Sequence, residues 1–533
     1  MRMTIKADQY EKIINSINVG NSIAESDYLL ESARVETPVF FGVLEDKYDI
    51  VLGRKGAGKT AIFKLIDFMK KFLLGRRNLV ILSGVNASGE SIFNKFKNSF
   101  KKFSENDFEN FWKLYFISLI YNEFIMNPLF DAKLSGCTKE INELRKECQT
   151  AGIPSIPANK SKTQLIDWII NNLRSFKIKA PVIVDTKNPT LFSVTPTIEV
   201  EFKDKTKTVQ EQESIYINNI GATLKSVLLK SGFKVWIILD RLDEVFDRYS
   251  STEFNGLRGL LKAYKSFDIG SEKDIFRIKI FLRDDIKSFL TDNNIYKQFF
   301  SKKDVPPLVA ATHIFSKESP TLSWSEDEIE QLILNRLLLT KTPLWDYLEI
   351  EKDYSNLKEA EIQEKLKDDL RNKNIRIKYW NQIFPEKISS SDSIKWIFTH
   401  LKDSNDVVTP RTVIDMLEAA NNYQKKKMQT NFSDSQIIFP VEALKDGISV
   451  ASKAKLEKDI YNEFPKDQKN IKMLIKIGKY KLDKQELKKN FGKQWEQTVE
   501  NLKRIGILRY IKNSDEYRIE FLFRPAMNII YKY

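Results

Sequence analysis

Short apolar runs alternate with stretches of helical periodicity over the first half of the chain. The apolar runs lie at 48–53, 78–85, 234–239 and 275–282. In the third run, four consecutive apolar residues from Trp236 to Leu239 end in an aspartate, a pattern typical of a strand buried on both faces of a parallel sheet. The alternation therefore predicts an α/β fold, with a parallel sheet flanked by helices.

Other segments depart from this alternation. Residues 22–33 show helical spacing and lead to Pro38, after which we expect an extended stretch. Residues 128–210 hold strand-like pieces broken by turns, which we interpret as an insertion. The pattern turns helical from about residue 323, and the basic run at 425–428 indicates a boundary. We therefore predict a sheet domain over 1–305 with an insertion at about 128–210, a helical domain over 306–435 and a third domain over 440–533.

The third domain has an element order of its own. Three helical stretches precede a hairpin that turns at 513–515, which matches a winged helix. Residues 451–533 hold 20 Lys and Arg against 11 Asp and Glu, a net of +9. The basic residues concerned are Lys493, Lys503, Arg504, Arg509, Lys512 and Arg518. They predict either contacts with the phosphates of DNA or RNA, or the solvated basic face of a protein-binding module, and charge alone does not separate the two.

Composition narrows the class of protein. The 533 residues are 42% hydrophobic, enough for sizeable cores, and the charge of 86 − 72 = +14 is compatible with a polyanionic partner. Two cysteines, Cys137 and Cys148, and two histidines, His313 and His400, argue against a disulfide framework and a Cys/His metal cluster. No signal peptide or membrane-spanning segment is evident, so we expect a soluble cytoplasmic protein without a membrane partner.

Residues 53–60, GRKGAGKT, match the phosphate-binding motif G-x-x-x-x-G-K-[ST] in full. Glycines let backbone N–H groups converge on phosphate oxygens, and the next helix directs its positive dipole end at them. We expect Lys59 to reach the β- and γ-phosphates and Thr60 to ligate Mg²⁺. The predicted nucleotide contacts are Gly53, Arg54, Lys55, Gly56, Ala57, Gly58, Lys59, Thr60 and Ala61. A chance glycine-rich turn is the alternative, and the flanking strand and amphipathic helix argue against it.

The stretch WIILDRLDE supplies the acidic partners of this loop. Asp240 ends a buried strand, the Walker B arrangement, and is expected to hold Mg²⁺. Asp243 or Glu244, and Glu244 before Asp243, is expected to orient or deprotonate the attacking water, which favours hydrolysis over phosphate transfer to another nucleotide. The alternative is an acidic helix start that stabilises a helix dipole.

Three arginines are further candidates. Arg283 follows the strand at 275–282, where it either reads the γ-phosphate or forms an Arg–Asp pair at a solvated strand end. Arg411 begins a helix in the helical domain, and it either reaches the nucleotide, so that nucleotide state sets the angle between domains, or is a surface residue. Arg258 follows the Walker B stretch and is considered for action on a neighbouring subunit.

Together, GRKGAGKT and ILDRLDE resemble the ASCE group of P-loop NTPases, close to its STAND and AAA+ branches. Five further stretches are similar to a family of prokaryotic P-loop ATPases: GNSIAESDYLLESARVETPVF, FLRDDI, LSWSEDEIEQLILNR, TPRTVIDMLEAA and LKRIGILRY. The resemblance covers most of the chain outside 128–210. It implies a P-loop ATPase domain, a helical lid and a C-terminal winged-helix-like domain, and it implies a role in bacterial anti-phage defence, where related ATPases are common.

The chain departs from the STAND pattern in two ways. Arg241 stands where a small residue usually follows the Walker B aspartate, and long C-terminal sensor repeats are missing. We therefore expect the ATPase to work with a separate sensor or effector chain, and as a homo-oligomer.

Four functions follow, in order of preference. The first is a Mg²⁺-dependent ATPase acting as a nucleotide-controlled switch. The second is a DNA-binding ATPase of initiator or loader type that uses residues 440–533. The third is a scaffold that holds a nucleotide without hydrolysing it, which Glu244 disfavours, and the last is a phosphotransferase. ATP is preferred to GTP because the chain has no clear N-K-x-D element.

Overall fold

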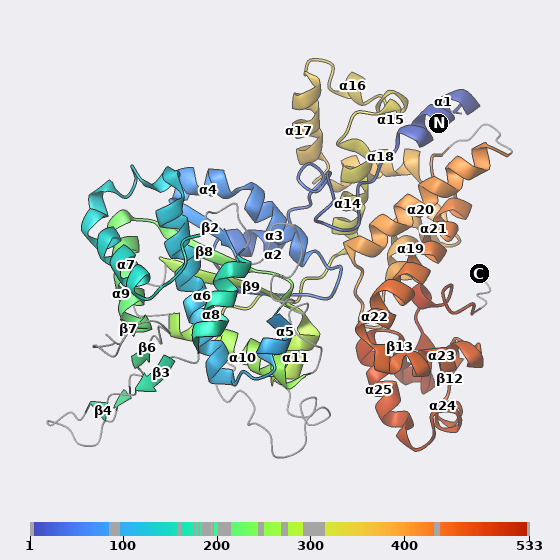
Figure 1. Cartoon of the computed structure of the whole chain (residues 1–533). Coiled ribbons are helices and arrows are strands. Elements are labelled where there is room, and N and C mark those ends of the chain that lie inside the picture. The colour runs from blue at the N-terminus through green and yellow to red at the C-terminus, as the bar shows by residue number, and fades with distance from the viewer. Residues whose placement is uncertain are drawn as a thin grey trace. The chain divides into compact units, whose positions relative to one another are not determined.

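The apolar runs of the first half of the chain form a parallel sheet. In a computed structural model of the protein, the sheet holds β1 (Ile50–Leu52), β2 (Leu79–Ser83), β8 (Lys234–Leu239) and β9 (Phe276–Leu282). They are hydrogen-bonded in the order β1-β9-β8-β2, every pairing is parallel, and helices flank the sheet (Figure 1). Most of the strand residues are buried on both faces. The predicted α/β fold with a parallel sheet is confirmed.

The structure describes residues 5–84, 96–156, 162–173, 219–242, 250–267, 275–291, 315–430 and 437–529, and the backbone alone of short segments between 176 and 218. The chain divides into two units. The first, here the sheet unit, comprises Gly42–Leu52 and Ile62–Thr321. The second, here the helical unit, comprises Met1–Phe41, Gly53–Ala61 and Leu322–Tyr533. The phosphate-binding loop of the sequence therefore packs as part of the helical unit.

Helices make up most of the rest of the sheet unit. Their bounds are α4 (Lys70–Arg77), α5 (Lys97–Phe100), α6 (Glu105–Met126), α7 (Thr138–Thr150), α8 (Thr163–Asn172), α9 (Ile217–Ser231), α10 (Ser251–Phe267) and α11 (Asp284–Thr291). Helix α6 buries aromatic side chains against α10, and the two cross so closely that a Cβ at Gly259 would lie 2.5 Å from Cβ of Phe108. Among the described residues, no helix combines the length and apolar character needed to cross a membrane.

The interpreted insertion at 128–210 contains both helices and strands. The helices α7 and α8 were not predicted, whereas strand-like pieces were, and the backbone shows β3 (Phe176–Lys179), β4 (Val182–Ile183), β5 (Ser193–Val194) and β6 (Thr197–Val200). Strand β6 pairs with β3 and with β7 (Ile215–Tyr216). Cys137 and Cys148 are buried and not joined to one another, and burial raises the pKa of both thiols.

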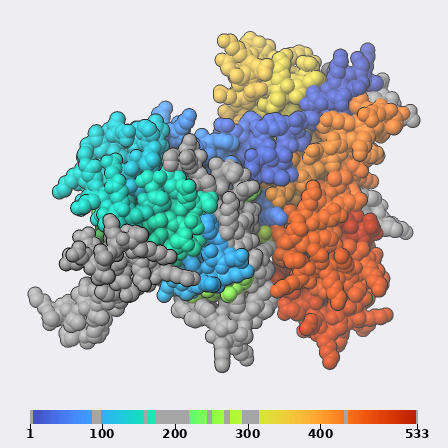
Figure 2. Space-filling view, in the orientation of Figure 1, coloured from blue at the N-terminus to red at the C-terminus, as the bar shows by residue number. Residues whose placement is uncertain are grey.

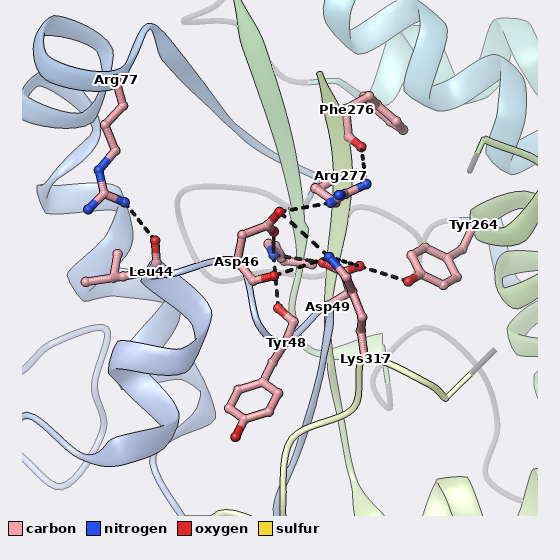
Figure 3. A network of polar contacts seen from close by, with 10 residues as sticks. Leu44, Asp46, Tyr48, Asp49, Arg77, Tyr264, Phe276, Arg277 and Lys317 are labelled. Atoms are coloured by element: carbon pink, nitrogen blue, oxygen red, sulfur yellow. Dashed lines mark hydrogen bonds and ion pairs between the residues drawn. The ribbon is translucent and has the colours of Figure 1, made fainter. Parts of the chain in front are cut away.

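A charged cluster lies where the chain enters β1 and β9 (Figure 3). Lys279 on β9 has no exposed surface, and its ammonium contacts carboxylate oxygens of Asp46 and of Asp49, the latter at 2.8 Å. Arg277 donates to Asp46 at 3.0 Å, and the Tyr264 hydroxyl donates to Asp49 at 2.9 Å. Buried charges are tolerated only when paired, so the cluster joins the segment before β1 to the strand that pairs with β1.

The stability of this cluster is expected to depend on pH through Asp46. Burial raises the pKa of Asp46, but the nearby cations Lys279, Arg277 and Lys317 outweigh burial and hold the pKa below its usual value. Because the folded pKa is the lower one, the stabilisation is complete above the unfolded pKa of about 4 and is lost as pH falls through the folded pKa. We expect Asp46→Asn to destabilise the sheet unit by about 1–3 kcal/mol at neutral pH.

The measurement is urea unfolding of wild type and Asp46→Asn at several pH values. The difference between the two is expected to shrink below about pH 4, since the wild-type carboxylate is then protonated. A difference that stays constant down to the lowest pH would show that the charge of Asp46 contributes nothing.

The helical unit collects segments from distant parts of the sequence. Between residues 322 and 454 it holds α14 (Glu326–Leu338), α15 (Pro343–Tyr347), α16 (Ile350–Asp353), α17 (Glu359–Asp369), α18 (Lys373–Ile383), α19 (Ser393–Leu401), α20 (Pro410–Met428) and α21 (Val441–Ala454), with a hairpin of β10 (Lys387–Ile388) and β11 (Ser391–Asp392). The N-terminal helix α1 (Ala7–Ser16) packs against α15 and α20, and Figure 2 shows the dark-blue N-terminal residues against the yellow and orange surface. One apolar core runs through α1, these helices and the C-terminal elements.

The segment after α1 differs from the prediction. Residues 22–33 form turns rather than a helix, and Pro38 begins the helix α2 (Pro38–Leu44) rather than an extended stretch. Asp27 explains the turns, because its Oδ1 accepts backbone N–H groups of Asn21 and Leu29 in competition with helical bonds. Its other oxygen pairs with Arg336 at 2.6 Å, and both side chains are buried.

The C-terminal elements follow the predicted order. After α21 the chain continues through a π-helical stretch, η6 (Lys455–Ile460), and α22 (Tyr461–Glu463). The predicted helices are α23 (Gln468–Ile477), α24 (Lys484–Phe491) and α25 (Trp495–Ile505). The predicted hairpin is β13 (Leu508–Ile511) with β14 (Glu516–Ile519), and Asp515 closes its turn with φ +45. A short strand not predicted, β12 (Lys481–Leu482), adds to β14.

Candidate functional site

The segment GRKGAGKT forms a loop between a strand and a helix. Strand β1 ends at Leu52, and helix α3 (Lys59–Phe68) begins at the motif lysine. Gly56 and Gly58 have φ of +78 and +106, values that residues with a side chain rarely adopt. The motif glycines are therefore required by the backbone path, and the loop leads into a helix N-terminus, where backbone N–H groups lack helical partners.

Lys59 folds back over its own loop. Its Nζ donates to the backbone carbonyls of Gly53 at 2.7 Å and Arg54 at 2.9 Å. These bonds hold the ammonium at the loop rather than in solvent. Thr60 follows as the second residue of α3 and is half-buried. A cation and a hydroxyl are thus placed beside a helix N-terminus, an arrangement suited to an anion.

Residues of the helical unit far along the chain cover the loop. A Cβ at Gly56 would lie 3.2 Å from Cβ of Arg411 and 3.4 Å from Oγ1 of Thr409, so the start of α20 lies directly against this glycine. Trp324 lies against Gly58, with its ring 3.6 Å from the place of a Cβ, and its Nε1 donates to the Ala57 carbonyl at 2.8 Å. Arg411, predicted as a nucleotide contact, is therefore next to the loop rather than a remote surface residue.

The two charged side chains inside the motif are engaged in ion pairs. Arg54 contacts Asp403 at 2.6 Å, and Asp403 also accepts the backbone N–H groups of Asn405 and Val407. Lys55 contacts Asp459 at 3.5 Å and Glu463 at 3.2 Å. These contacts join the loop to the 403–407 turn and to the stretch η6–α22.

Asp459 is shared between cations. Besides Lys55 it contacts Arg411 at 3.3 Å and Lys455 at 3.1 Å. Burial raises the pKa of its carboxyl, but Lys455, Arg411 and Lys55 outweigh burial and lower the pKa below the usual value. Asp459 is therefore held as a carboxylate next to two residues that contact the loop.

In the sheet unit, Asp240 and Arg283 lie just beyond the ends of neighbouring strands. Asp240 follows β8, is 2% exposed, and precedes Arg241, which has φ +58. Arg283 follows β9, is 6% exposed, and donates to both oxygens of Asp285 at 2.9 and 3.1 Å. The Arg–Asp pair considered for Arg283 is present, at a buried rather than a solvated strand end.

Two sequence candidates need separate mention. Asp243 and Glu244 lie outside the described residues, so their predicted roles stay predictions. Arg258 is 6% exposed and pairs with Glu105 at 2.7 Å, which does not fit an arginine that acts on a neighbouring subunit.

The basic C-terminal residues divide into two groups. Arg509 pairs with Asp406 and Glu520, and these bonds raise the pKa of its guanidinium; Lys503 pairs with Glu500, and Arg518 with Glu516. Lys493 and Lys512 are exposed, and Arg504 is half-buried. Helix α25 also exposes Glu496 and Glu500. The basic excess of this segment is thus partly used in internal ion pairs.

Sequence reasoning missed the residues that cover the loop. Trp324 and Thr409 lie in stretches noted for resemblance, but neither was assigned to the loop. Asp459 and Glu463 are four residues apart, a spacing that places two carboxylates on one helical face. That spacing signals a cation partner, although it does not identify Lys55.

No metal or nucleotide site is assigned by coordination or likeness. Within the described part of the chain, no group of three or more His, Cys, Asp or Glu side chains is placed to hold a metal ion. The chain matches no protein-family signature, no curated protein and no solved structure.

Proposed function

We propose that the protein is a Mg²⁺-dependent ATPase that acts as a nucleotide-controlled switch. The observation that carries the proposal is the loop at 53–60, which follows a buried parallel strand, opens a helix at Lys59 and has left-handed glycines at 56 and 58. This arrangement presents backbone N–H groups and an ammonium to one anion, the chemistry that a nucleotide phosphate requires. A triphosphate of adenosine is preferred for the reason given from the sequence.

The proposed chemistry assigns a role to each predicted residue. Lys59 binds the β- and γ-phosphates, and Arg283 is assigned to the γ-phosphate. The Thr60 hydroxyl and the Asp240 carboxylate are hard oxygen donors of the kind that Mg²⁺ prefers, so we assign them as its ligands; Mg²⁺ neutralises charge on the phosphates when bound. Glu244, with Asp243 as the alternative, orients or deprotonates the attacking water.

The ion pairs of the loop support a switch rather than a simple hydrolase. Arg54 and Lys55 connect the loop to Asp403 and to Asp459 and Glu463, which lie beside the C-terminal elements. Ser404 extends this connection, because its N–H donates to the Gly506 carbonyl at the end of α25 at 2.8 Å. A nucleotide that repositions the loop therefore acts on groups that hold the C-terminal segment. The defence role and the effector partner remain part of the proposal through resemblance alone.

The C-terminal segment bears on the second function, a DNA-binding ATPase. Its elements have the winged-helix order, which supports a winged-helix-like module. However, Arg509, Lys503 and Arg518 are engaged internally, and the exposed Glu496 and Glu500 on α25 repel a phosphate backbone. These placements favour a module that faces protein.

The test is ATP hydrolysis and particle mass by light scattering, with and without duplex DNA. We expect wild type to hydrolyse ATP only with Mg²⁺, and Glu244→Gln to bind ATP, to hydrolyse it at least about a hundredfold more slowly and to accumulate as a larger assembly without DNA. Hydrolysis that requires DNA would replace the switch by the DNA-binding function. Absence of Mg²⁺–nucleotide binding by wild type would overturn the proposal.

A further inference from the structure

Trp324 makes an unusual pair of contacts with the phosphate-binding loop. Its indole N–H donates to the Ala57 carbonyl at 2.8 Å, and its ring lies against Gly58, the residue across the same peptide bond. One side chain therefore touches both sides of the peptide between Ala57 and Gly58. Trp324 is half-buried and comes just before α14, so it reaches the loop from elsewhere in the helical unit.

The orientation of this peptide matters for anion binding. In a trans peptide the carbonyl and the following N–H point in opposite directions. The described chain holds no cis peptide bond. When the indole holds the Ala57 carbonyl on one side of the loop, the N–H of Gly58 is directed to the opposite side. Gly58 has φ +106, a conformation with few restraints of its own, so an external hydrogen bond has a large share in fixing the peptide.

We propose that Trp324 is a positioning residue of the phosphate-binding loop, whose indole N–H holds the Ala57–Gly58 peptide in the orientation that directs the Gly58 N–H at a phosphate oxygen. This role rests on the proposed function, since it requires that the loop binds the phosphates of a nucleotide. Trp324 itself touches no reacting atom. It acts through a backbone donor, and backbone donors aimed at phosphate are part of the binding energy of such loops.

The chain offers a matched control for the substitution. Trp345 lies in the same unit, and its Nε1 donates to the Leu338 carbonyl at 2.7 Å, away from the loop. Replacing either tryptophan by phenylalanine keeps a ring and removes one indole-to-carbonyl hydrogen bond. The two variants share the structural cost of the change, and only Trp324→Phe alters the loop. Trp324→Leu is the second variant, because it removes the same N–H with a different side-chain shape.

The test measures affinity for MgADP by calorimetry and for inorganic pyrophosphate by competition with MgADP. We expect Trp324→Phe and Trp324→Leu to weaken MgADP binding about tenfold, the scale of one hydrogen bond to a charged group. Pyrophosphate is expected to weaken by the same factor, since it shares only the phosphates with the nucleotide. Trp345→Phe is expected to lower the unfolding midpoint and to leave both affinities unchanged.

Each result separates the two proposals. If wild type binds MgADP and Trp324→Phe binds it equally well, the positioning role is overturned and the ATPase proposal stands. If MgADP weakens while pyrophosphate does not, Trp324 acts on the nucleoside and the positioning role is again overturned. If wild type binds neither ligand, the proposed function itself fails.

Discussion

Replacing Lys59 with alanine is expected to reduce MgATP affinity by about a hundredfold and hydrolysis by about a thousandfold. The Lys59 ammonium is held at the loop by the carbonyls of Gly53 and Arg54, so it is preorganised beside the N-terminus of α3. Loss of a preorganised cation removes charge-assisted hydrogen bonds to phosphate, and the loss is greater in the transition state, where charge shifts on the transferred group. Calorimetry with MgADP and MgATP and a steady-state hydrolysis assay measure the two effects.

Lys55 is the matched control, because it is a lysine of the same loop with different partners. Its ammonium contacts Asp459 and Glu463 instead of the loop carbonyls. Lys55→Ala is expected to change nucleotide affinity by no more than a few fold, through the coupling of the loop to η6–α22. Equal losses in Lys55→Ala and Lys59→Ala would contradict the distinct role of Lys59, since they would show only that positive charge near the loop matters.

Replacing Lys279 with methionine is expected to destabilise the sheet unit by about 3–5 kcal/mol. Lys279 has no exposed surface, and Asp49, its partner at 2.8 Å, is 2% exposed. Methionine keeps most of the volume and leaves the Asp49 carboxylate buried without its nearest cation. The loss is measured by native-state hydrogen exchange in peptides that contain β1 and β9, because exchange reports on this sheet separately from the helical unit.

Two further variants decide how the loss arises. Lys317→Met removes a cation that is 34% exposed and lies 3.8 and 4.0 Å from the same two carboxylates, and we expect it to cost less than about 1 kcal/mol. Adding Asp49→Asn to Lys279→Met is expected to recover part of the stability, since it removes the unpaired charge. If the double variant is as unstable as the sum of the two single changes, the buried pair is not the cause.

The strands and the loop were predictable because their signals are local. An apolar run that ends in a glycine or an aspartate reports its own burial, and the loop residues 53–60 are contiguous. The charged residues within β9 show the limit of this reasoning. Arg277 and Lys279 are buried in a strand because Asp46 and Asp49 meet them, and those partners lie more than 200 residues earlier in the sequence.

The surroundings of the loop were less predictable for the same reason. Arg54 and Asp403 are 349 residues apart, and Trp324 is 267 residues from Ala57. Nothing near either residue indicates its partner, because the pairing depends on how the helical unit folds. Arg411 was assigned by analogy with related ATPases rather than by a local pattern. The turns at 22–33 were mispredicted because the buried pair of Asp27 and Arg336 outweighs helical spacing.

The π-helical stretch η6 fixes the register of every carboxylate that meets Lys55. A π-turn holds one residue more than an α-turn, and in proteins it often records a single-residue insertion into an older helix. Removing one residue from 455–460 would restore an α-helix and rotate all that follows by about 100° about its axis. Glu463, in α22 just beyond η6, would then face away from the loop. The ion pair of Lys55 with this helix therefore depends on helix length, so an insertion or deletion here can change the chain's regulation while every loop residue stays the same.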